Sequence, residues 1–296
     1  MGDARPASFY WLAAFFTLFL LFLYGPMLAI FVLSFQGPTG GLTFPLNGMS
    51  VHWFRKLFAG GGIVDIGSAF RRSLQLGLTV MMVTVVLSVL AGLAFRKKFW
   101  GQSFVFYAAV ASLIVPSIVT SLGIALQFRL LDDAVKAFGP GFVSNGYTTS
   151  MGLFTSGLGA HLTWTLPFGL LIMFAIFNRF DRRLEEAAQD LGATPWQTFR
   201  HVILPIILPS LVGIALFGFT LSWDEIARSS QAIGERNTLP LELQALTTTV
   251  TTPEIYALGT VTTGVSFIVI GLSLAAIQFL RMRQARHGSD AGNGMV

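Results

Sequence analysis

Six long apolar runs, separated by polar connectors, dominate the pattern of the chain. A helix needs about 20 apolar residues to cross the roughly 30 Å hydrocarbon core of a bilayer, and each run reaches this length. The pattern therefore predicts an all-α membrane protein with six transmembrane helices. The predicted spans cover residues 9–35, 71–95, 103–128, 153–177, 204–223 and 256–280.

Charged residues indicate where the predicted spans meet water. Basic residues gather at the ends of the second, fourth and sixth spans, and the positive-inside rule places such ends in the cytoplasm. Arg71 and Arg72, at the start of the second span, oppose this bias. We therefore expect residues 1–8 and 281–296 on the cytoplasmic side of a transmembrane domain that covers 9–280. Because the second of these tails is rich in Gly, Asp and Asn, we expect it to be disordered.

The composition excludes several classes of protein. Hydrophobic residues make up 53 % of the chain and charged residues 11 %, which is more apolar surface than a soluble core of this length could bury. Cys is absent, so neither a disulfide nor a thiolate site is possible. The chain has no G-x-x-x-x-G-K-[ST], H-E-x-x-H or G-x-S-x-G motif, and its four His lack metal-ligand spacing. We therefore expect no catalytic residue, no metal and no cofactor bound by this chain, and no nucleic-acid partner.

One connector is unusually polar and contains closely spaced helix-ending and helix-starting residues: EEAAQDLGATPWQTFRHVILP at 185–205. The residues before Gly192 favour helix, and glycine commonly follows a helix end because it adopts a left-handed conformation at little cost. Thr194 is a good N-cap, Pro195 suits the first helical position and Gln197 completes a capping box. The segment therefore predicts a helix, a sharp turn and a short helix. From these local features alone, such a segment could equally lie on the membrane surface.

We call residues 182–203 the elbow, and the spacing within it resembles a known loop. Glu186-Ala187-Ala188, Gly192 and Val202-Ile203-Leu204-Pro205 resemble the EAA motif of permease subunits of binding-protein-dependent ABC importers, which has Ile at the position of Val202. The resemblance implies a type I ABC importer permease (MetI-like) architecture, in which the elbow is a cytoplasmic coupling loop that docks on a separate ATPase subunit. The implied coupling residues are Glu185, Glu186, Ala187, Ala188, Asp190, Gly192, Ala193, Thr194 and Pro195.

Further stretches resemble one branch of this family. HLTWTLPFGLLI at 161–172, FGFTLSWDEI at 217–226, TLPLELQAL at 238–246 and TPEIYALGT at 252–260 are similar to the second permease subunit of spermidine/putrescine-type systems. This resemblance implies a bacterial inner-membrane subunit, not an enzyme, that forms half of the path for a small organic solute such as a polyamine. The implied partners are a homologous permease subunit, two ATPase subunits that bind ATP and Mg, an extracytoplasmic solute-binding protein and membrane lipid.

Ionisable and aromatic residues near membrane depth indicate where a solute could pass. Asp224 and Glu225 lie at the outer end of the fifth span, where carboxylates beside a tryptophan could meet a cationic solute. Alternatively, both carboxylates are solvated or pair with Arg228. The fourth span adds a tryptophan and a histidine, although a lone intramembrane His more often bonds a neighbouring helix than a substrate. The substrate-path candidates are Asp224, Glu225, Trp223, Trp164 and His161.

Two prolines inside predicted spans and three charged residues after the third span are expected to have structural roles and not to contact the solute. Pro116 and Pro167 lie inside predicted spans and are expected mainly to bend them. The charged residues Arg129, Asp132 and Asp133 follow the third span, and we expect them to be solvated at the outer surface.

A stand-alone secondary transporter or channel for a small solute is the alternative to an importer subunit. Such a protein is expected to show internal repeats or intramembrane carboxylates for ion coupling. The sequence shows neither clearly, so the importer subunit is the favoured interpretation.

Overall fold

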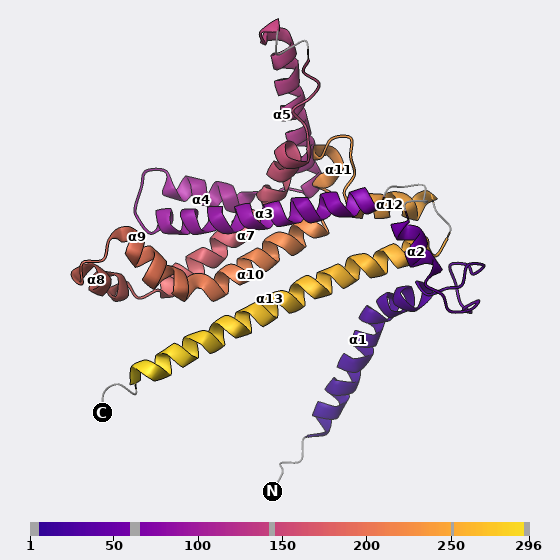
Figure 1. Ribbon diagram of the computed structural model, residues 1–296, viewed down its shortest axis with the longest axis horizontal. Helices are drawn as coiled ribbons and strands as arrows, with labels where there is room; N and C mark the ends of the chain where they lie inside the picture. The colour runs from indigo at the N-terminus through magenta and orange to yellow at the C-terminus, as the bar shows by residue number, and fades with distance from the viewer. Residues whose placement is uncertain (1–5, 60–65, 142–145, 250–251, 293–296) are drawn as a thin grey trace. The chain divides into compact units, whose positions relative to one another are not determined.

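The computed structural model describes residues 6–59, 66–141, 146–249 and 252–292. Within these ranges the chain is helical, as predicted, and contains no named strand (Figure 1). The ends of the two expected tails, residues 1–5 and 293–296, lie outside the described residues. Five stretches are long and apolar enough, by length and composition, to cross a membrane: Ala7–Leu33, Ile66–Phe95, Leu153–Arg179, Pro195–Trp223 and Glu254–Leu280.

The helices follow one another with short connections in most places. In chain order they are α1 (Ala7–Leu33), α2 (His52–Phe58), α3 (Ile66–Phe95), α4 (Gln102–Ala111), α5 (Ser117–Phe138), the π-helical turn η1 (Leu153–Gly157), α7 (Leu158–Arg179), α8 (Arg183–Asp190), α9 (Pro195–Thr198), the π-helical turn η2 (Phe199–Ile203), α10 (Leu204–Trp223), α11 (Ser229–Ala232), α12 (Leu239–Thr249) and α13 (Glu254–Gly292).

The third predicted span, 103–128, is divided in the structure. α4 ends at Ala111 and α5 begins at Ser117, with Pro116 (φ −54°, ψ 133°) as the N-cap residue of α5. Proline lacks an N–H group and disfavours helical geometry in the residue before it, so the first helix ends ahead of it and a second begins after it. Pro116 therefore breaks this segment, where the sequence predicted only a bend.

The chain packs into two compact units: Met1–Gly67 with Glu242–Val265, and Ser68–Leu241 with Ser266–Val296. In the first unit, the buried side chain of Gln36 organises the loop after α1. Its Oε1 accepts a hydrogen bond from the Asn47 N–H at 2.6 Å. Lys56 Nζ of α2 lies 2.9 Å from Glu254 Oε2 at the start of α13.

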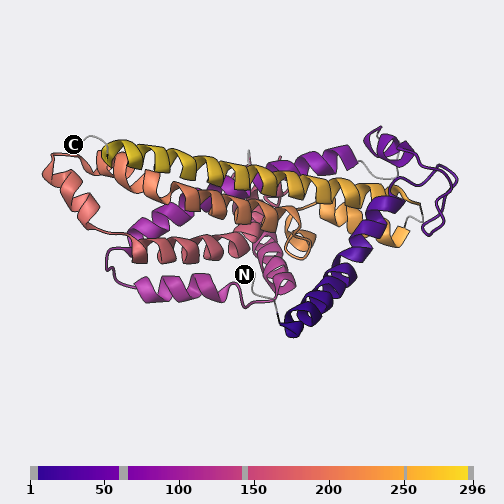
Figure 2. The same ribbon diagram turned by 90° about the horizontal axis from the view of Figure 1, so that it is seen from below.

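The second unit contains a bundle of α3, α7 and α10, with α4 beside α7 (Figures 1 and 2). Thr84 of α3 and Thr165 of α7 share a buried hydrogen bond between their hydroxyl groups at 2.8 Å. Gly218 of α10 lies so close to α3 that a Cβ atom there would be 3.2 Å from Cα of Met81. The core of the bundle is made of Val89, Met173, Ile203, Ile207, Leu211 and Ile214.

The last helix is longer than the sixth predicted span. α13 continues to Gly292, past residue 280 and through much of the segment expected to be a disordered tail. In the most apolar part of Glu254–Leu280 no residue is buried. In the most apolar part of α1 very few residues are buried. Such unburied apolar helices require lipid or partner subunits around them.

Candidate functional site

The elbow forms the helix, turn and helix that its sequence predicts. α8 is followed by Gly192, whose φ is +86°. The Gly192 N–H donates to the carbonyl of Gln189 at 2.8 Å, and the Ala193 N–H donates to the carbonyl of Ala188 at 3.0 Å. Because this left-handed conformation favours glycine, the prediction of a tight turn at Gly192 is confirmed.

The second helix of the elbow begins with the predicted capping box. The Gln197 N–H donates to Thr194 Oγ1 at 3.3 Å, and the Thr194 N–H donates to Gln197 Oε1 at 2.8 Å. Pro195 occupies the start of α9. Helical structure then continues from α9 through η2 into α10 without a break.

The elbow exposes both charged and apolar side chains. No residue of α8 is buried. Leu191 is 89 % exposed and Trp196 is 64 % exposed. Glu186 is exposed and forms no ion pair within the described part of the chain. Large apolar side chains exposed next to charges are typical of a surface that binds another protein.

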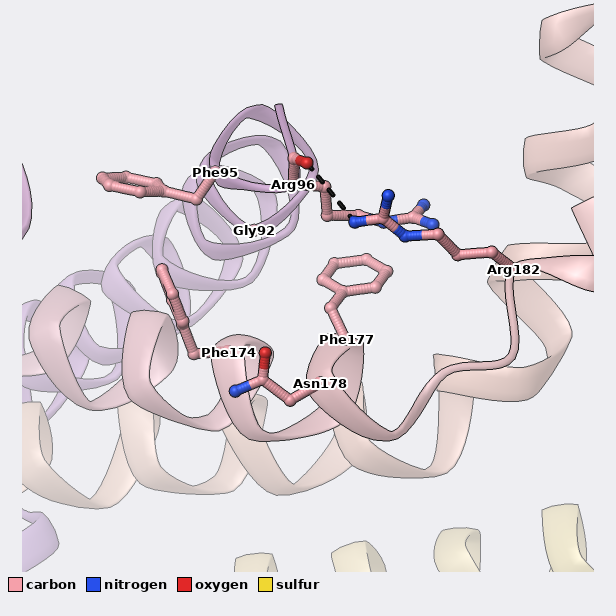
Figure 3. A pocket seen from close by; sticks show the side chains of 7 residues that line it. All are labelled: Gly92, Phe95, Arg96, Phe174, Phe177, Asn178 and Arg182. Carbon is pink, nitrogen blue, oxygen red and sulfur yellow. Dashed lines mark hydrogen bonds between the residues drawn. The ribbon is translucent and has the colours of Figure 1, made fainter. Parts of the chain in front are cut away.

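Arg96, which directly follows α3, ties the elbow to the helix bundle. Its guanidinium group forms an ion pair with Glu185, and it lies 4.9 Å from the ring centroid of Phe177 and 5.3 Å from that of Phe180. Arg182 Nη2 donates to the Arg96 carbonyl at 3.5 Å. Figure 3 shows the Arg96 and Arg182 side chains extending toward each other beside the Phe177 ring. Arg96 therefore joins the ends of α3 and α7 to the start of α8.

The two neighbouring glutamates of the elbow consequently have different environments. The side chain of Glu185 is 17 % exposed and points to Arg96, whereas Glu186 is exposed. From the sequence, Arg96 is only one of the basic residues that mark the end of the second predicted span. Its contact with Glu185 could not be predicted, because a basic residue at the end of a span carries no signal of its partner. A cavity of about 780 Å³ adjoins this contact, with an apolar wall that includes Leu93 and a rim that includes Glu186 and Trp196.

Asp224 and Glu225 also have different environments. Glu225 accepts a hydrogen bond at Oε1 from the Arg228 backbone N–H at 2.9 Å, and its Oε2 lies 3.5 Å from Arg228 Nη1. Asp224 is exposed and has no ion-pair partner within the described ranges. Partial desolvation and the charge of neighbouring Glu225 raise the pKa of the Asp224 carboxyl above its ordinary value. The alternative in which these carboxylates pair with Arg228 therefore applies to Glu225.

Arg228 is buried and lies over Trp164. Its side chain is 1 % exposed. Nη1 donates to Ser117 Oγ at 2.7 Å, Nε donates to Thr163 Oγ1 at 3.3 Å, and the guanidinium carbon lies 4.5 Å from the Trp164 ring centroid. A cation of the chain itself thus occupies one face of this tryptophan, and sequence analysis had assigned Arg228 only a possible pairing role.

The other two substrate-path candidates lie in packed surroundings. His161 is 1 % exposed; its Nδ1 lies 2.8 Å from Ser222 Oγ and its Nε2 lies 2.9 Å from Ser229 Oγ. This is the helix-to-helix bonding that the sequence analysis considered the commoner role for a lone histidine. Trp223 is 1 % exposed and packs against Phe219. The expectation of an aromatic face open to solute at Trp223 therefore differs from the structure, because the large indole ring is buried.

The expectation that Asp132 is a solvated charge is wrong. Asp132 is 6 % exposed, and its carboxylate accepts hydrogen bonds from the hydroxyl groups of Tyr147, Thr149 and Ser150 and from the Ser150 N–H. Burial alone would raise the pKa of Asp132, but these hydrogen bonds outweigh burial and hold the pKa well below its usual range. Arg129 and Asp133 are exposed, as expected.

No group of three or more His, Asp or Glu side chains able to hold a metal ion occurs in the part of the chain that the structure describes. The site thus combines an exposed surface of charged and apolar side chains at the elbow with an exposed carboxylate at the far end of α10. A buried polar network around His161 and Arg228 lies next to that carboxylate.

Comparisons with known proteins agree with these features. Residues 84–286 match the sequence profile of the family described as binding-protein-dependent transport system inner membrane component. The chain is 30 % identical over 275 residues to the spermidine/putrescine transport system permease protein PotC of Haemophilus influenzae, covering 93 % of this chain and 97 % of that protein. It is also 30 % identical over 251 residues to the putrescine transport system permease protein PotI of Escherichia coli, covering 84 % of each.

Solved structures with a similar fold are also ABC transporters. A bacterial transporter that imports the acidic polysaccharide alginate matches with a TM-score of 0.65 and 15 % identity, covering 93 % of this chain and 94 % of that chain. The MetNI methionine ABC transporter in an inward-facing conformation matches with a TM-score of 0.54 and 15 % identity, covering 78 % and 99 %. These likenesses concern the fold, and the sequence match carries the assignment: the chain belongs to the family of binding-protein-dependent transport system inner membrane components.

Proposed function

We propose that this permease subunit forms half of the solute path of an ATP-driven importer and that its elbow docks on a separate ATPase subunit in the cytoplasm. The observation that carries the proposal is the exposed surface of the elbow, where Glu186, Leu191 and Trp196 project from a rigid turn. ATP and Mg would bind to the ATPase partner. The family assignment favours this role over a stand-alone secondary transporter or channel.

The elbow would act as a lever between the ATPase and the membrane. The capping box at Thr194 and the ion pair of Glu185 with Arg96 limit its internal flexibility. Closure of two ATPase subunits around ATP would displace the elbow, and the continuous helix through η2 would carry the displacement into α10. Such a switch requires that the ATP-bound partner binds one state of the permease more tightly than the other.

The remaining partners and the topology follow from the same assignment. The unburied apolar surface of α1 suits contact with lipid and with a homologous permease subunit. We place both termini in the cytoplasm, with 9–280 as the transmembrane permease domain, 182–203 as its coupling loop and 281–296 as a cytoplasmic tail. A solute-binding protein would then dock on the opposite, extracytoplasmic side. The membrane is the bacterial inner membrane.

The solute proposed for this importer is a polyamine. PotC and PotI, each 30 % identical to this chain, are permease proteins of spermidine/putrescine and putrescine systems. Asp224 is the candidate best placed to meet a cationic solute, since it is exposed and unpaired with described residues, while Glu225 is engaged by Arg228. Attraction between a carboxylate and an amine cation at a partly desolvated position is favourable.

Co-purification tests the docking role of the elbow. The tagged chain is isolated from native membranes in mild detergent, and the subunits that accompany it are identified for the wild type and for Glu186→Lys. We expect an ATPase subunit with the wild type and about tenfold less of it with the variant, because reversing an exposed charge at an interface creates like-charge contacts.

Glu235→Lys is the matched control, since Glu235 is also exposed and lies after α11, away from the elbow. It should retain the ATPase at the wild-type level. If the wild type carries no ATPase, the subunit works without one and the stand-alone alternative returns. If Glu186→Lys retains the ATPase fully, the elbow is not the docking surface.

A further inference from the structure

A second large cavity lies at the end of α3 that is remote from the elbow. Its volume is about 790 Å³, and its walls come from the start of α3, from α5, from the loop before η1 and from the loop after α11. α3 has 30 residues, so about 45 Å of helix separates its two ends. Figure 1 shows α11 near one end of α3 and the elbow helices α8 and α9 near the other. The charged residues that line the cavity are Arg72, Arg129, Lys136, Arg236, Asp132 and Glu235.

Cations outnumber anions around this cavity, four to two. Both oxygens of the Asp132 carboxylate accept hydrogen bonds from Tyr147, Thr149 and Ser150, and this carboxylate forms no ion pair with a cation in the described ranges. Arg129 and Lys136 are exposed and form no ion pair with any residue in the described ranges. Asp132 and Glu235 offset half of the four positive charges, so the cavity keeps a net positive charge.

The scaffold under these cations is held in place by long-range hydrogen bonds. Arg72 Nε donates to the Asn237 carbonyl at 2.7 Å, and the Leu239 N–H donates to Ser73 Oγ at 2.7 Å. These bonds fasten the loop after α11 to the start of α3. Asp132 likewise fastens the 147–150 loop to α5. These hydrogen bonds fix the backbone segments that carry the cations, and such preorganisation lowers the entropic cost of binding a partner.

Resting on the proposed function, we propose that this cavity is the docking site for an acidic segment of the extracytoplasmic solute-binding protein. If the elbow faces the cytoplasmic ATPase, the opposite end of α3 faces the binding protein. A concave surface with a net positive charge attracts acidic side chains and steers their approach. The same cations repel a polyamine, so the cavity suits the protein that delivers the solute and lies apart from the path of a cationic solute.

Binding of an acidic peptide tests this surface directly. The tagged full-length chain, with any subunits that accompany it, is placed in phosphatidylcholine nanodiscs, and the affinity for fluorescent hexaglutamate is measured at low and high salt. We expect binding that weakens with salt and that falls about tenfold in Arg129→Gln/Lys136→Gln, since two charge contacts are lost. Hexalysine should not bind.

Arg71→Gln is the matched control. Arg71 is exposed on the same end of α3 but does not line the cavity, so its loss should leave hexaglutamate affinity unchanged. Equal affinity in the double variant and in the Arg71→Gln control overturns the proposal. Citrate binding as tight as hexaglutamate binding also overturns it, because the cavity would then be a site for small anions. Neither result depends on whether an ATPase co-purifies, so failure of this inference and failure of the proposed function are distinguishable.

Discussion

Arg96 and Glu185 form an ion pair between the end of α3 and the first helix of the elbow, across 89 positions of sequence. Both side chains are mostly buried, with 14 % and 17 % exposed. No residue of α8 is itself buried, and this pair fastens the start of α8 to the end of α3. In the proposed coupling role, this pair would help to hold the elbow in the orientation that docks on the ATPase subunit.

Loss of the Arg96 charge should uncouple ATP hydrolysis from transport. A partly buried ion pair contributes about 1 kcal/mol, so in Arg96→Gln the population of the competent elbow should fall about fivefold. We expect a similar fall in putrescine transported per ATP hydrolysed by the reconstituted complex. Lys97→Gln removes the same charge one residue further on, where no ion pair with described residues exists, and should not change this ratio. Normal coupling in Arg96→Gln would show that the pair does not orient the elbow.

Replacement of Gly192 by valine should damage the same lever by a different route. A β-branched residue at a φ of +86° is strained by roughly 1–2 kcal/mol. The space around a Cβ atom is open at this position, so the strain comes from the backbone and not from a clash. Gly192→Val should insert into the membrane at wild-type levels yet transport poorly, as measured by uptake and by quantitative immunoblot.

Asparagine tolerates the left-handed conformation better than valine, and Gly192→Asn is therefore the control. It should retain most of the uptake. Full uptake in the valine variant would mean that the turn at Gly192 is not needed for coupling.

Asp224 and Glu225 are adjacent, yet only Asp224 should act on the solute. In Asp224→Asn the KM for putrescine should rise about two- to fivefold, as expected for loss of an exposed charge contact, while thermal stability stays unchanged. The pKa of Asp224 is raised, so its charge is lost at a higher pH than for an ordinary aspartate. Wild-type affinity should therefore fall as the pH falls through this raised pKa, and the affinity of the variant should lack that component. A KM unaffected by the substitution would remove Asp224 from the solute path.

The elbow could be predicted from sequence because its determinants are local. Gly192, Thr194 and Gln197 lie within one short stretch, and each acts on its immediate backbone neighbours. Arg228 could not be predicted in this way, since its partners Thr163 and Ser117 are 65 and 111 positions away. Asp132 was placed wrongly for a related reason.

The donors to Asp132 belong to a loop whose return to α5 leaves no mark in the hydropathy pattern. Hydropathy also predicted the third span as one continuous helix and did not reveal its interruption at Pro116, because apolar residues continue on both sides of this proline. Sequence therefore gives the order and class of the helices, while the contacts that fix their ends depend on tertiary structure.

The close approach of α3 and α10 at Gly218 should be essential for packing of the bundle. A Cβ atom at Gly218 would lie 3.2 Å from Cα of Met81 and 3.4 Å from Cβ of Thr84. The first of these neighbours is backbone, so a valine there would have to separate the two helices. Small residues allow such approach in membrane bundles, and loss of the packing costs roughly 1–3 kcal/mol. Gly218→Val should therefore lower the Tm of the detergent-solubilised complex by several degrees, as measured by a thermal shift assay.

Gly213 provides the control on the same helix. A Cβ atom at Gly213 meets no other atom within 4 Å, so Gly213→Val has the same change in composition and the same helix propensity without the clash. The Tm of this variant should stay close to that of the wild type. If both variants lower the Tm equally, the cost arises from valine in α10 itself, and the contact of Gly218 with α3 is not what holds the bundle together.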